Sequence, residues 1–325
     1  MKDYINNQHR YYTLDYYYKN KYNSKVFKIA LNGNFTCPNR DGTLSTKGCI
    51  FCSEKGSGDF AGDKELPLSK QWDEIKAIML KKWDNAKYIP YFQANTNTYG
   101  PLDKIKKLFD EAITLDKDIV AIDIATRPDS ISQETLNYLS TLNKKIPVIL
   151  ELGLQTIHDD TQKILNTGYT LNQFVKCVER LRSFNIEVVV HIINGLPFET
   201  KDMMLETIKF LNSLDIQGIK IHSLFVLKNT ELEKMYNNNE FKLLELDEYV
   251  DIVTEQLALL RDDIVVHRIN GDAPRASLIA PLWSLKKFVI MNEIDKEMKK
   301  RNYYQGCKKW GIKQFLILFF ICLLE

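Results

Sequence analysis

The sequence has almost no excess of charge of either sign. Its 44 lysine and arginine residues nearly balance its 42 aspartate and glutamate residues, which leaves a formal net charge of +2. Bulk charge therefore does not indicate a nucleic-acid-binding protein, and a polyanionic partner would require a local basic patch. Two segments are candidates: residues 16–19, which read YYYK, and the lysine- and arginine-rich stretch 286–309. Core aromatic residues and a solvated helix face, respectively, are the simpler interpretations.

The features of a secreted protein are also missing. The first twelve residues, MKDYINNQHRYY, contain no apolar segment of the kind found in a secretory signal. Six cysteines in 325 residues are too few for a disulfide-stabilised secreted domain. We therefore expect a cytoplasmic protein, in which clustered cysteines usually hold metal.

Long hydrophobic runs are scarce. Residues 315–324 read FLILFFICLL, but ten residues are too few to span a bilayer, which takes about 20. We therefore expect no stable membrane insertion. This apolar tail fits a final core element, an interfacial anchor or a frayed end, and the sequence favours none of the three.

Short apolar segments rich in β-formers alternate with amphipathic segments along most of the chain. The six strand candidates are residues 26–31, 88–93, 119–124, 147–152, 187–193 and 218–222. Apolar residues recur at helical spacing over 102–113 and 171–181. This alternation predicts βα units, a parallel sheet and right-handed crossovers that curl the sheet into a full or partial barrel. Loops at the carboxyl ends of the strands would then carry the chemistry.

The pattern changes after residue 236. A turn at 237–239 precedes a predicted helix over 246–260, a short strand over 264–267 and a helix over 285–301. We therefore predict an α/β protein: a partial (β/α)6, TIM-like barrel over 25–236 with a C-terminal α/β extension over 237–306. An N-terminal segment, 1–24, and the apolar tail, 307–325, flank these two parts.

Three cysteines are clustered directly after the first predicted strand. Cys37, Cys49 and Cys52 form a C-x11-C-x2-C pattern. A structural zinc ion would require a fourth ligand, and Asp41, Asp59 or a distant cysteine are the nearest candidates. A [4Fe–4S] cluster can be held by three cysteines, which leaves one iron open to a small molecule. On spacing alone, a cluster, a zinc site and ordinary cysteines all remain open.

Several sequence motifs in addition to the cysteines resemble motifs of a known protein family. The loop begins CPNRDG at residue 37 and ends GCIFC at residue 52. Further motifs are YFQANTNTY at 91–99, TRPD at 126–129, ELGLQT at 151–156, GLP at 195–197 and APLWS at 280–284. Together they resemble the YtqA/YhcC group of radical S-adenosylmethionine (SAM) proteins over about residues 10–306. The group is similar in turn to Elp3-type enzymes, which also have a stretched cysteine loop. Residues 53–60 of this sequence resemble part of that loop.

The resemblance implies a radical SAM barrel with two cofactors. Cys37, Cys49 and Cys52 would hold a [4Fe–4S] cluster, and SAM would occupy its open iron through amino and carboxylate groups. Reductive cleavage of SAM would yield a 5′-deoxyadenosyl radical, which abstracts hydrogen from an unreactive carbon. Phe51, between the last two cysteines, would shield the cluster from water.

The resemblance also indicates which side chains would bind SAM. Gln93 and Asn95, at the end of the second strand, would contact the methionine amino group, although a glycine-rich backbone usually does so. Glu151 and Gln155 would bind the ribose hydroxyls. For Gln93 and Asn95, the alternative is an ordinary polar strand end. For Glu151 and Gln155, the alternative is a residue that is favoured at a helix start by the helix dipole.

The turn after the fifth predicted strand and several later residues have further candidate roles. Gly195 and Pro197 would approach the adenine, unless they form a plain strand-to-helix turn. Arg127 would bind the SAM carboxylate or a substrate anion, with a surface ion pair as the alternative. His267 and Arg268 would meet the substrate, unless they belong to a structural turn.

Three other positions do not fit these roles. Residues 166–169, NTGY, stand where relatives often carry Arg-Gly-His, so no histidine or arginine can act there. His191 and His222 lie in apolar strands, where core packing is the simpler interpretation.

The resemblance points to tRNA as substrate. Elp3-type enzymes remodel the C5 side chain of the wobble uridine, and the YtqA branch is associated with conversion of a carboxymethylaminomethyl group into an aminomethyl group. Expected partners are a reductant protein of the flavodoxin or ferredoxin type, tRNA and a downstream methyltransferase. A radical SAM enzyme acting on a small metabolite or peptide, and a structural zinc protein, are the alternatives.

Overall fold

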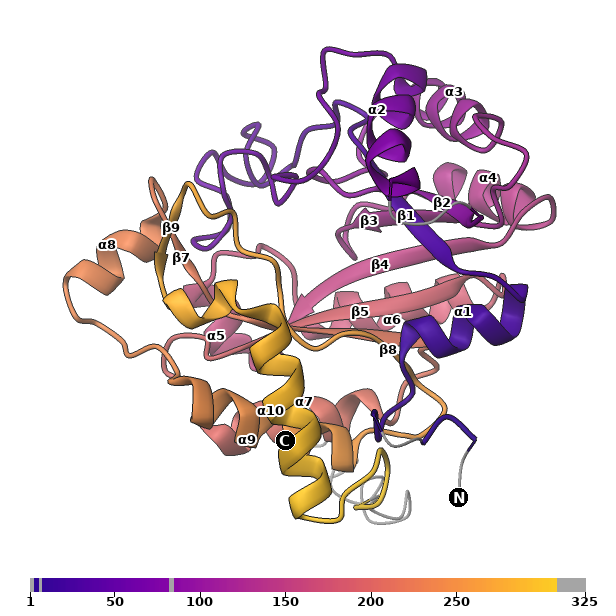
Figure 1. The fold of residues 1–325 in the computed structure, drawn as a ribbon. Helices are drawn as coiled ribbons and strands as arrows, with labels where there is room; N and C mark the ends of the chain where they lie inside the picture. Colours follow the sequence, from indigo (N-terminus) through magenta and orange to yellow (C-terminus); the bar gives the residue numbers. More distant parts are fainter. Residues whose placement is uncertain (1–2, 6–7, 82–84, 309–325) are drawn as a thin grey trace.

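The computed structural model describes residues 3–5, 8–81 and 85–308 of the chain. A seven-stranded parallel sheet, in the order β1-β2-β3-β4-β5-β6-β8, forms an open half barrel with helices around it (Figure 1). Its strands are β1 (Val26–Leu31), β2 (Lys87–Phe92), β3 (Ile122–Thr126), β4 (Val148–Gln155), β5 (Glu187–Asn194), β6 (Gly218–Ser223) and β8 (Val265–Arg268). A second, two-stranded sheet pairs β7 (Val226–Leu227) with β9 (Leu278–Ala280).

Most helices connect successive strands. They are α1 (Leu14–Tyr22), α2 (Leu68–Leu80), α3 (Leu102–Ala112), α4 (Gln133–Asn143), α5 (Asp159–Ile164), α6 (Leu171–Arg182), α7 (Lys201–Leu211), α8 (Glu231–Asn237), α9 (Leu246–Leu259), the 3-10 helix η1 (Leu282–Leu285) and α10 (Lys287–Lys300). Five of these begin after a serine or threonine whose side chain accepts a hydrogen bond from the backbone N–H three residues on. These capping residues are Thr13, Ser132, Thr170, Thr200 and Thr230.

The two faces of the sheet have different chemistry because side chains alternate along each strand. On the outer face, Ile29, Leu150 and Val190 are buried in the main hydrophobic core, which the helices complete. On the inner face, the intervening positions include Glu151 and His191, which line a cavity. The polar interior of the half barrel is therefore a consequence of alternation within strands that are otherwise apolar.

The N-terminal segment covers the amino end of the half barrel. Tyr18 of α1 packs inside it against Ile89 and Val189, in a small core cluster of its own. The backbone N–H of Val266 in β8 donates to the Tyr12 carbonyl oxygen at 2.8 Å, and α1 contacts both edge strands, β1 and β8. Of the YYYK segment, Tyr18 is thus a core residue, as the simpler interpretation held.

The prediction of a parallel, partial barrel is confirmed, with one strand more than the six predicted. All six predicted strands are present, with ends shifted by three residues at most. The short strand expected within the C-terminal extension is β8, and it pairs with β6 through Gly218 and Val265. The sheet therefore continues into the part of the chain expected to lie outside the barrel.

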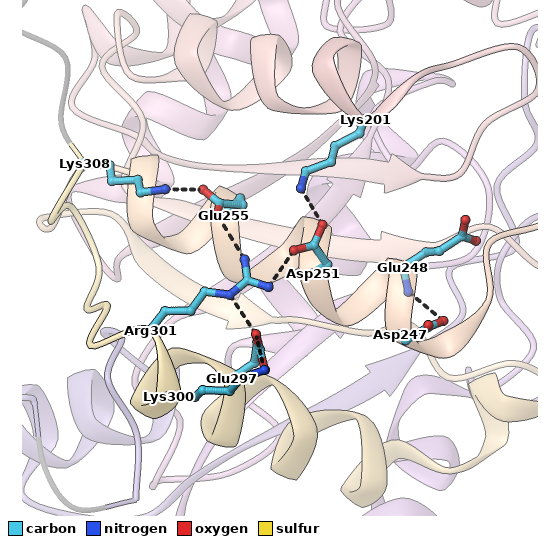
Figure 2. A network of polar contacts seen from close by, with 9 residues as sticks. All are labelled: Lys201, Asp247, Glu248, Asp251, Glu255, Glu297, Lys300, Arg301 and Lys308. Carbon is cyan, nitrogen blue, oxygen red and sulfur yellow. Dashed lines mark hydrogen bonds and ion pairs between the residues drawn. The ribbon is translucent and has the colours of Figure 1, made fainter.

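An ionic network joins the C-terminal helices α9 and α10, and Lys201 of α7 connects it to the barrel through Asp251 (Figure 2). Arg301, just after α10, contacts Asp251 at 2.7 Å, Glu255 at 3.0 Å and Glu297 at 2.8 Å. Lys308 contacts Glu255 at 2.7 Å. Much of the positive charge in the basic stretch 286–309 is thus paired within the protein, as expected of a solvated helix face.

No helix within the described residues is long and apolar enough to cross a membrane. The apolar tail at 315–324 lies outside the described residues.

Candidate functional site

A cavity of about 290 Å³ opens at the carboxyl ends of the strands. Side chains from the cysteine loop and from six of the barrel strands or the loops that follow them line it. Its polar and sulfur-bearing lining residues are Cys37, Arg40, Cys49, Cys52, Ser53, Ser57, Asp59, Tyr91, Gln93, Asn95, Thr96, Thr126, Arg127, Glu151, Gln155, Tyr169, His191, Lys220, His222, Ser223, Arg268 and Asp272. Carboxyl strand ends are where parallel barrels carry their active sites.

All three clustered cysteines face this cavity. Burial, with the nearby Cys52 thiol, raises the pKa of Cys49 to about 12, although Arg127 and Asn39 act to lower it. Burial also raises the pKa of Cys52, against the opposing charge of Arg40. Within residues 3–5, 8–81 and 85–308, no three His, Cys, Asp or Glu side chains converge as ligands of one metal ion. A [4Fe–4S] cluster distributes its cysteines over different irons, so three separate thiols around one cavity fit its ligand set.

Arg40 holds the C-x2-C turn in place. Its guanidinium donates to the carbonyl oxygens of Cys52 at 3.0 Å, Ser53 at 2.5 Å and Glu54 at 3.0 Å. The backbone N–H of Cys52 in turn donates to the Cys49 carbonyl oxygen at 3.1 Å. The side chain of Arg40 therefore fixes the geometry of the turn that presents two of the thiols.

The segment after α5 clamps the other side of the cysteine loop. Asn39 Nδ2 donates to the Asn166 carbonyl oxygen at 2.5 Å and lies 3.5 Å from Cys49 Sγ. Asn166 Nδ2 donates to the Gly48 carbonyl oxygen at 2.7 Å, and Ile50 N–H donates to the Leu165 carbonyl oxygen at 3.1 Å. The NTGY segment, which departs from the pattern of relatives, thus positions the cysteine loop.

Arg127 lies beside the cysteines and is held from two directions. It makes a two-pronged contact with Asp129, with Nε–Oδ1 at 2.9 Å and Nη2–Oδ2 at 2.6 Å. Its guanidinium also stacks over the Tyr169 ring, 5.0 Å from the ring centre. Burial acts to lower the pKa of Arg127, but the Asp129 carboxylate keeps it above its ordinary value. This guanidinium is rigid and permanently charged at the cavity wall.

Glu151 of β4 is the centre of a buried polar network below the cavity. One carboxylate oxygen accepts from Lys28 Nζ at 2.8 Å. The other accepts from Lys220 Nζ at 2.5 Å, from the Tyr91 hydroxyl at 2.6 Å and from His191 Nε2 at 2.8 Å. Burial acts to raise the pKa of Glu151, but the Lys220 and Lys28 ammonium groups hold it well below its usual range. Glu151 is therefore an anion with both oxygens already occupied.

Two further members of this network titrate near neutral pH. Burial and the Glu151 charge raise the pKa of Asp123 to about 7, even though Lys28 contacts its carboxylate. Burial lowers the pKa of Lys220 to about 8, because the neighbouring cations Lys28 and Arg268 oppose the attraction of Glu151. Lys220 also lines the cavity, and a strongly shifted pKa of a buried cavity-lining group is typical of functional sites.

Most of the side chains predicted for SAM and substrate lie at this cavity. Besides the cysteines, these are Gln93, Asn95, Arg127, Glu151, Gln155 and Arg268. Asn95 also ties the cysteine loop to β2: its Nδ2 donates to the Phe35 carbonyl oxygen at 3.0 Å, and its N–H donates to the Gly56 carbonyl oxygen at 2.8 Å. Gln155 lies against Gly153, whose carbonyl oxygen accepts from the Tyr169 hydroxyl at 2.8 Å.

Three predicted residues lie elsewhere. Gly195 and Pro197 are not among the cavity-lining residues; Gly195 faces Leu244, and its N–H lies 3.2 Å from the Met204 sulfur. His267 also lies outside the lining, with Nδ1 3.5 Å from Lys28 Nζ. The pairing of β6 with β8 is irregular at this point, because Ile219 pairs with Val266 and Lys220 with Arg268. The irregularity directs Arg268, rather than His267, to the cavity.

Sequence reasoning missed several residues that shape the site. Lys28, Asp123 and Lys220 are single charges at the middle of apolar strands, and this pattern was the available signal. His191 and His222, for which core packing was the simpler interpretation, line the cavity and stack on each other with ring centres 5.2 Å apart.

Comparisons with known proteins agree with this geometry. The Radical SAM superfamily profile matches residues 40–211, and the radical SAM C-terminal domain profile matches residues 216–300. The chain is 46% identical to YtqA of Bacillus subtilis (strain 168), covering 93% of this chain and 94% of YtqA. It is 30% identical to YhcC of Escherichia coli (strain K12), covering 86% of this chain and 89% of YhcC.

More distant relatives are Elp3 proteins. A tRNA uridine(34) acetyltransferase of Methanocaldococcus infernus is 25% identical over 58% of this chain and 35% of its own length. The solved structure of Methanocaldococcus infernus Elp3 with an N-terminal deletion superposes with a TM-score of 0.65 and 17% identity, covering 87% of this chain and 64% of that one. The structural likeness shows a shared fold.

Proposed function

The chain belongs to the radical SAM superfamily and, within it, to the YtqA/YhcC group, and on this premise we propose that its cavity binds a [4Fe–4S] cluster and SAM to remodel the C5 side chain of a tRNA wobble uridine. One observation carries the proposal. Three thiols share a single cavity with an array of polar side chains from the carboxyl ends of the barrel strands.

Cys37, Cys49 and Cys52 would hold three irons of the cluster and leave the fourth to SAM. When bound, the cluster supplies the electron that cleaves SAM into methionine and a 5′-deoxyadenosyl radical. The chain contributes the surroundings: Phe51 lines the cavity and would exclude water, Arg40 fixes the turn, and Asn39 donates toward Cys49. Donors and cations beside thiolate sulfur stabilise its negative charge.

Some of the polar lining residues hold the cysteine loop, and others are free to bind SAM. Asn95 is occupied in holding that loop, so we assign the methionine amino group to Gln93 and the SAM carboxylate to Arg127. Gln155 is assigned to the ribose hydroxyls. Glu151 supports the ribose site from below, because both of its oxygens already accept hydrogen bonds. For the adenine, Ile193 takes the place of Gly195 and Pro197, because Ile193 lines the cavity.

The tRNA substrate is inferred from the Elp3 relatives, one of which is named for tRNA uridine 34. In the proposed reaction, a hydrogen atom leaves the methylene between nitrogen and carboxylate of the carboxymethylaminomethyl group and forms 5′-deoxyadenosine. Loss of one electron and one proton gives an imine, and water hydrolyses it to the aminomethyl group and glyoxylate. The electron passes to a one-electron carrier protein of the flavodoxin or ferredoxin type.

Mass spectrometry of tRNA nucleosides from a gene-deletion strain tests this proposal. We expect carboxymethylaminomethyl uridine to accumulate and aminomethyl uridine and its methylated product to disappear. A plasmid-borne wild-type gene should restore aminomethyl uridine and its methylated product. A gene with Cys307→Ala should restore them too, since Cys307 is not among the residues that line the cavity. Cys52→Ala should not restore them.

Unchanged nucleosides in a host that makes the modification would contradict the tRNA assignment. If the purified protein still formed 5′-deoxyadenosine, that outcome would favour a small metabolite or a peptide as the substrate.

A further inference from the structure

The cavity has a nitrogen-lined floor, formed by Lys220 and His222 of β6 and Arg268 of β8. The cysteines belong to the loop beyond the end of β1, whereas Lys220 lies in the middle of its strand. A ligand that fills the cavity therefore has thiols at one end and cationic or imidazole groups at the other.

The charges around this floor are paired, but N–H donors remain for a ligand. Lys220 lies 2.5 Å from Glu151, and Arg268 Nη2 lies 3.0 Å from Asp272 Oδ2. Lys28 contacts Glu151 and Asp123, and Lys287 contacts Asp272 from outside the cavity lining. A guanidinium has five N–H donors, so the contact with Asp272 leaves Arg268 with donors for a further anion.

One polar atom at the floor has no partner of its own, and it is a donor in the tautomer that carries the proton on Nε2. In the part of the chain that the structure describes, His222 Nε2 is buried without a hydrogen-bond partner. The ring is held in place by stacking on His191, whose own Nε2 is committed to Glu151. A buried polar atom left unsatisfied is costly, and a ligand that bonds to it removes the cost.

We propose that the floor of the cavity is a carboxylate-binding subsite, in which Arg268, Lys220 and His222 hold a carboxylate group of the substrate. A carboxylate matches all three groups because it is planar, carries one negative charge and accepts several hydrogen bonds. The inference deepens the proposed function and rests on it for the substrate as a whole.

The subsite explains how a flexible side chain would be aligned for hydrogen abstraction. In a carboxymethylaminomethyl group, the reacting methylene is bonded directly to the carboxylate carbon. Fixing the carboxylate on the floor therefore places that methylene between the floor and the thiol end of the cavity, where SAM would lie. Such positioning is a large part of catalysis between two bound reactants.

N-Methylglycine is a suitable probe, because it reproduces the nitrogen, methylene and carboxylate of this side chain without the nucleoside. Its binding to the cluster-reconstituted, SAM-loaded protein can be measured by saturation-transfer NMR. N-Methylethanolamine, which has a hydroxymethyl group in place of the carboxylate, is the control ligand. We expect saturable binding of N-methylglycine and at least tenfold weaker binding of the control.

Arg268→Gln should weaken N-methylglycine binding about tenfold, and Arg268→Lys should restore part of the loss. The matched control is Lys287→Gln, since Lys287 also contacts Asp272 but is not among the cavity-lining residues, and its binding should equal that of the wild type. Far-UV circular dichroism and the optical spectrum of the reconstituted cluster show whether Arg268→Gln is folded.

Equal binding of both ligands by the wild type, or unchanged binding by Arg268→Gln, would overturn the subsite. These results are independent of tRNA. If the protein binds N-methylglycine but leaves tRNA unchanged, the subsite is supported and the tRNA assignment is rejected. If the protein converts tRNA but does not bind N-methylglycine selectively, the tRNA assignment is supported and the subsite is rejected.

Discussion

The Arg40 guanidinium lies 3.0 Å from the carbonyl oxygen of Cys52, and with two further carbonyl contacts it closes the turn between the second and third cysteines. We expect Arg40→Gln to lower the affinity for iron about 10- to 100-fold, the usual effect of removing a group that orients metal ligands. Iron and sulfide per chain after anaerobic reconstitution measure this. Lys47→Gln, an exposed residue of the same loop, is the control. Full iron loading of Arg40→Gln at limiting iron would contradict the assigned role.

Gly56 allows the cysteine loop to lie against β2. A Cβ atom at this position would lie 1.9 Å from Asn95 Oδ1, and its φ of +61° is itself unfavourable for alanine. We expect Gly56→Ala to displace Asn95 and to reduce cluster retention at least as strongly as Arg40→Gln. Gly42→Ala is matched for strain, because Gly42 has a φ of +94° and its nearest contact is 3.9 Å away. Equal iron retention by the two alanine variants would show that the clash is unimportant.

The strands and the cysteine loop were predictable because local patterns determine them. Apolar β-rich runs gave all six expected strands, and the spacing of Cys37, Cys49 and Cys52 marked the loop. The polar interior was not predicted, although Lys28, Asp123 and Lys220 stand alone within apolar strands. Which face of a strand turns inward depends on the register of the whole sheet, which single segments do not contain.

The predicted site residues that do not line the cavity have similar causes. Gly195 and Pro197 follow a strand end as expected, but the turn packs toward Leu244 and Met204 and away from the cavity. His267 and Arg268 are adjacent, and an irregularity in the pairing of β6 with β8 decides which of them reaches the cavity. Pairing irregularities of this kind arise between strands far apart in sequence.

Binding of a carboxylate should weaken at alkaline pH. Lys220 has a pKa of about 8 in the free protein, so it is charged below this pH and loses its proton above it. A bound carboxylate favours the charged form, so the Kd of N-methylglycine should rise about threefold to tenfold from about pH 7 to pH 9.5. Groups that surround Lys220 are Lys28, Tyr91, Asp123, Glu151, His191 and Arg268.

The Lys220→Met variant distinguishes the titration of Lys220 from the titration of other groups near the cavity. The variant should bind N-methylglycine more weakly at pH 7 and show little further change up to pH 9.5. A flat profile for the wild type, or the same slope in Lys220→Met, would assign the pH dependence to another group. Retention of the cluster spectrum in the variant shows that the cysteine end of the cavity is intact.

The network around Arg301 should stabilise the packing of α10 on α9. Arg301→Gln removes the cation from three carboxylates at once (Figure 2), and we expect a loss of about 1 kcal/mol, within the upper range for partly exposed ion pairs. The thermal unfolding midpoint should fall by about 2–4 °C. Lys296→Gln, which removes a single exposed contact with Glu293, should change it by much less. A loss that does not shrink at high salt would argue against an ionic origin.

The central claim is that the three thiols of one cavity hold a cluster that cleaves SAM. Anaerobic reconstitution with iron and sulfide, followed by an optical spectrum and an assay for 5′-deoxyadenosine from SAM and dithionite, tests it most directly. We predict a brown protein with about four irons per chain that forms 5′-deoxyadenosine, and a Cys52→Ala variant that does not. A colourless, zinc-loaded protein that is folded and leaves SAM intact would contradict the account.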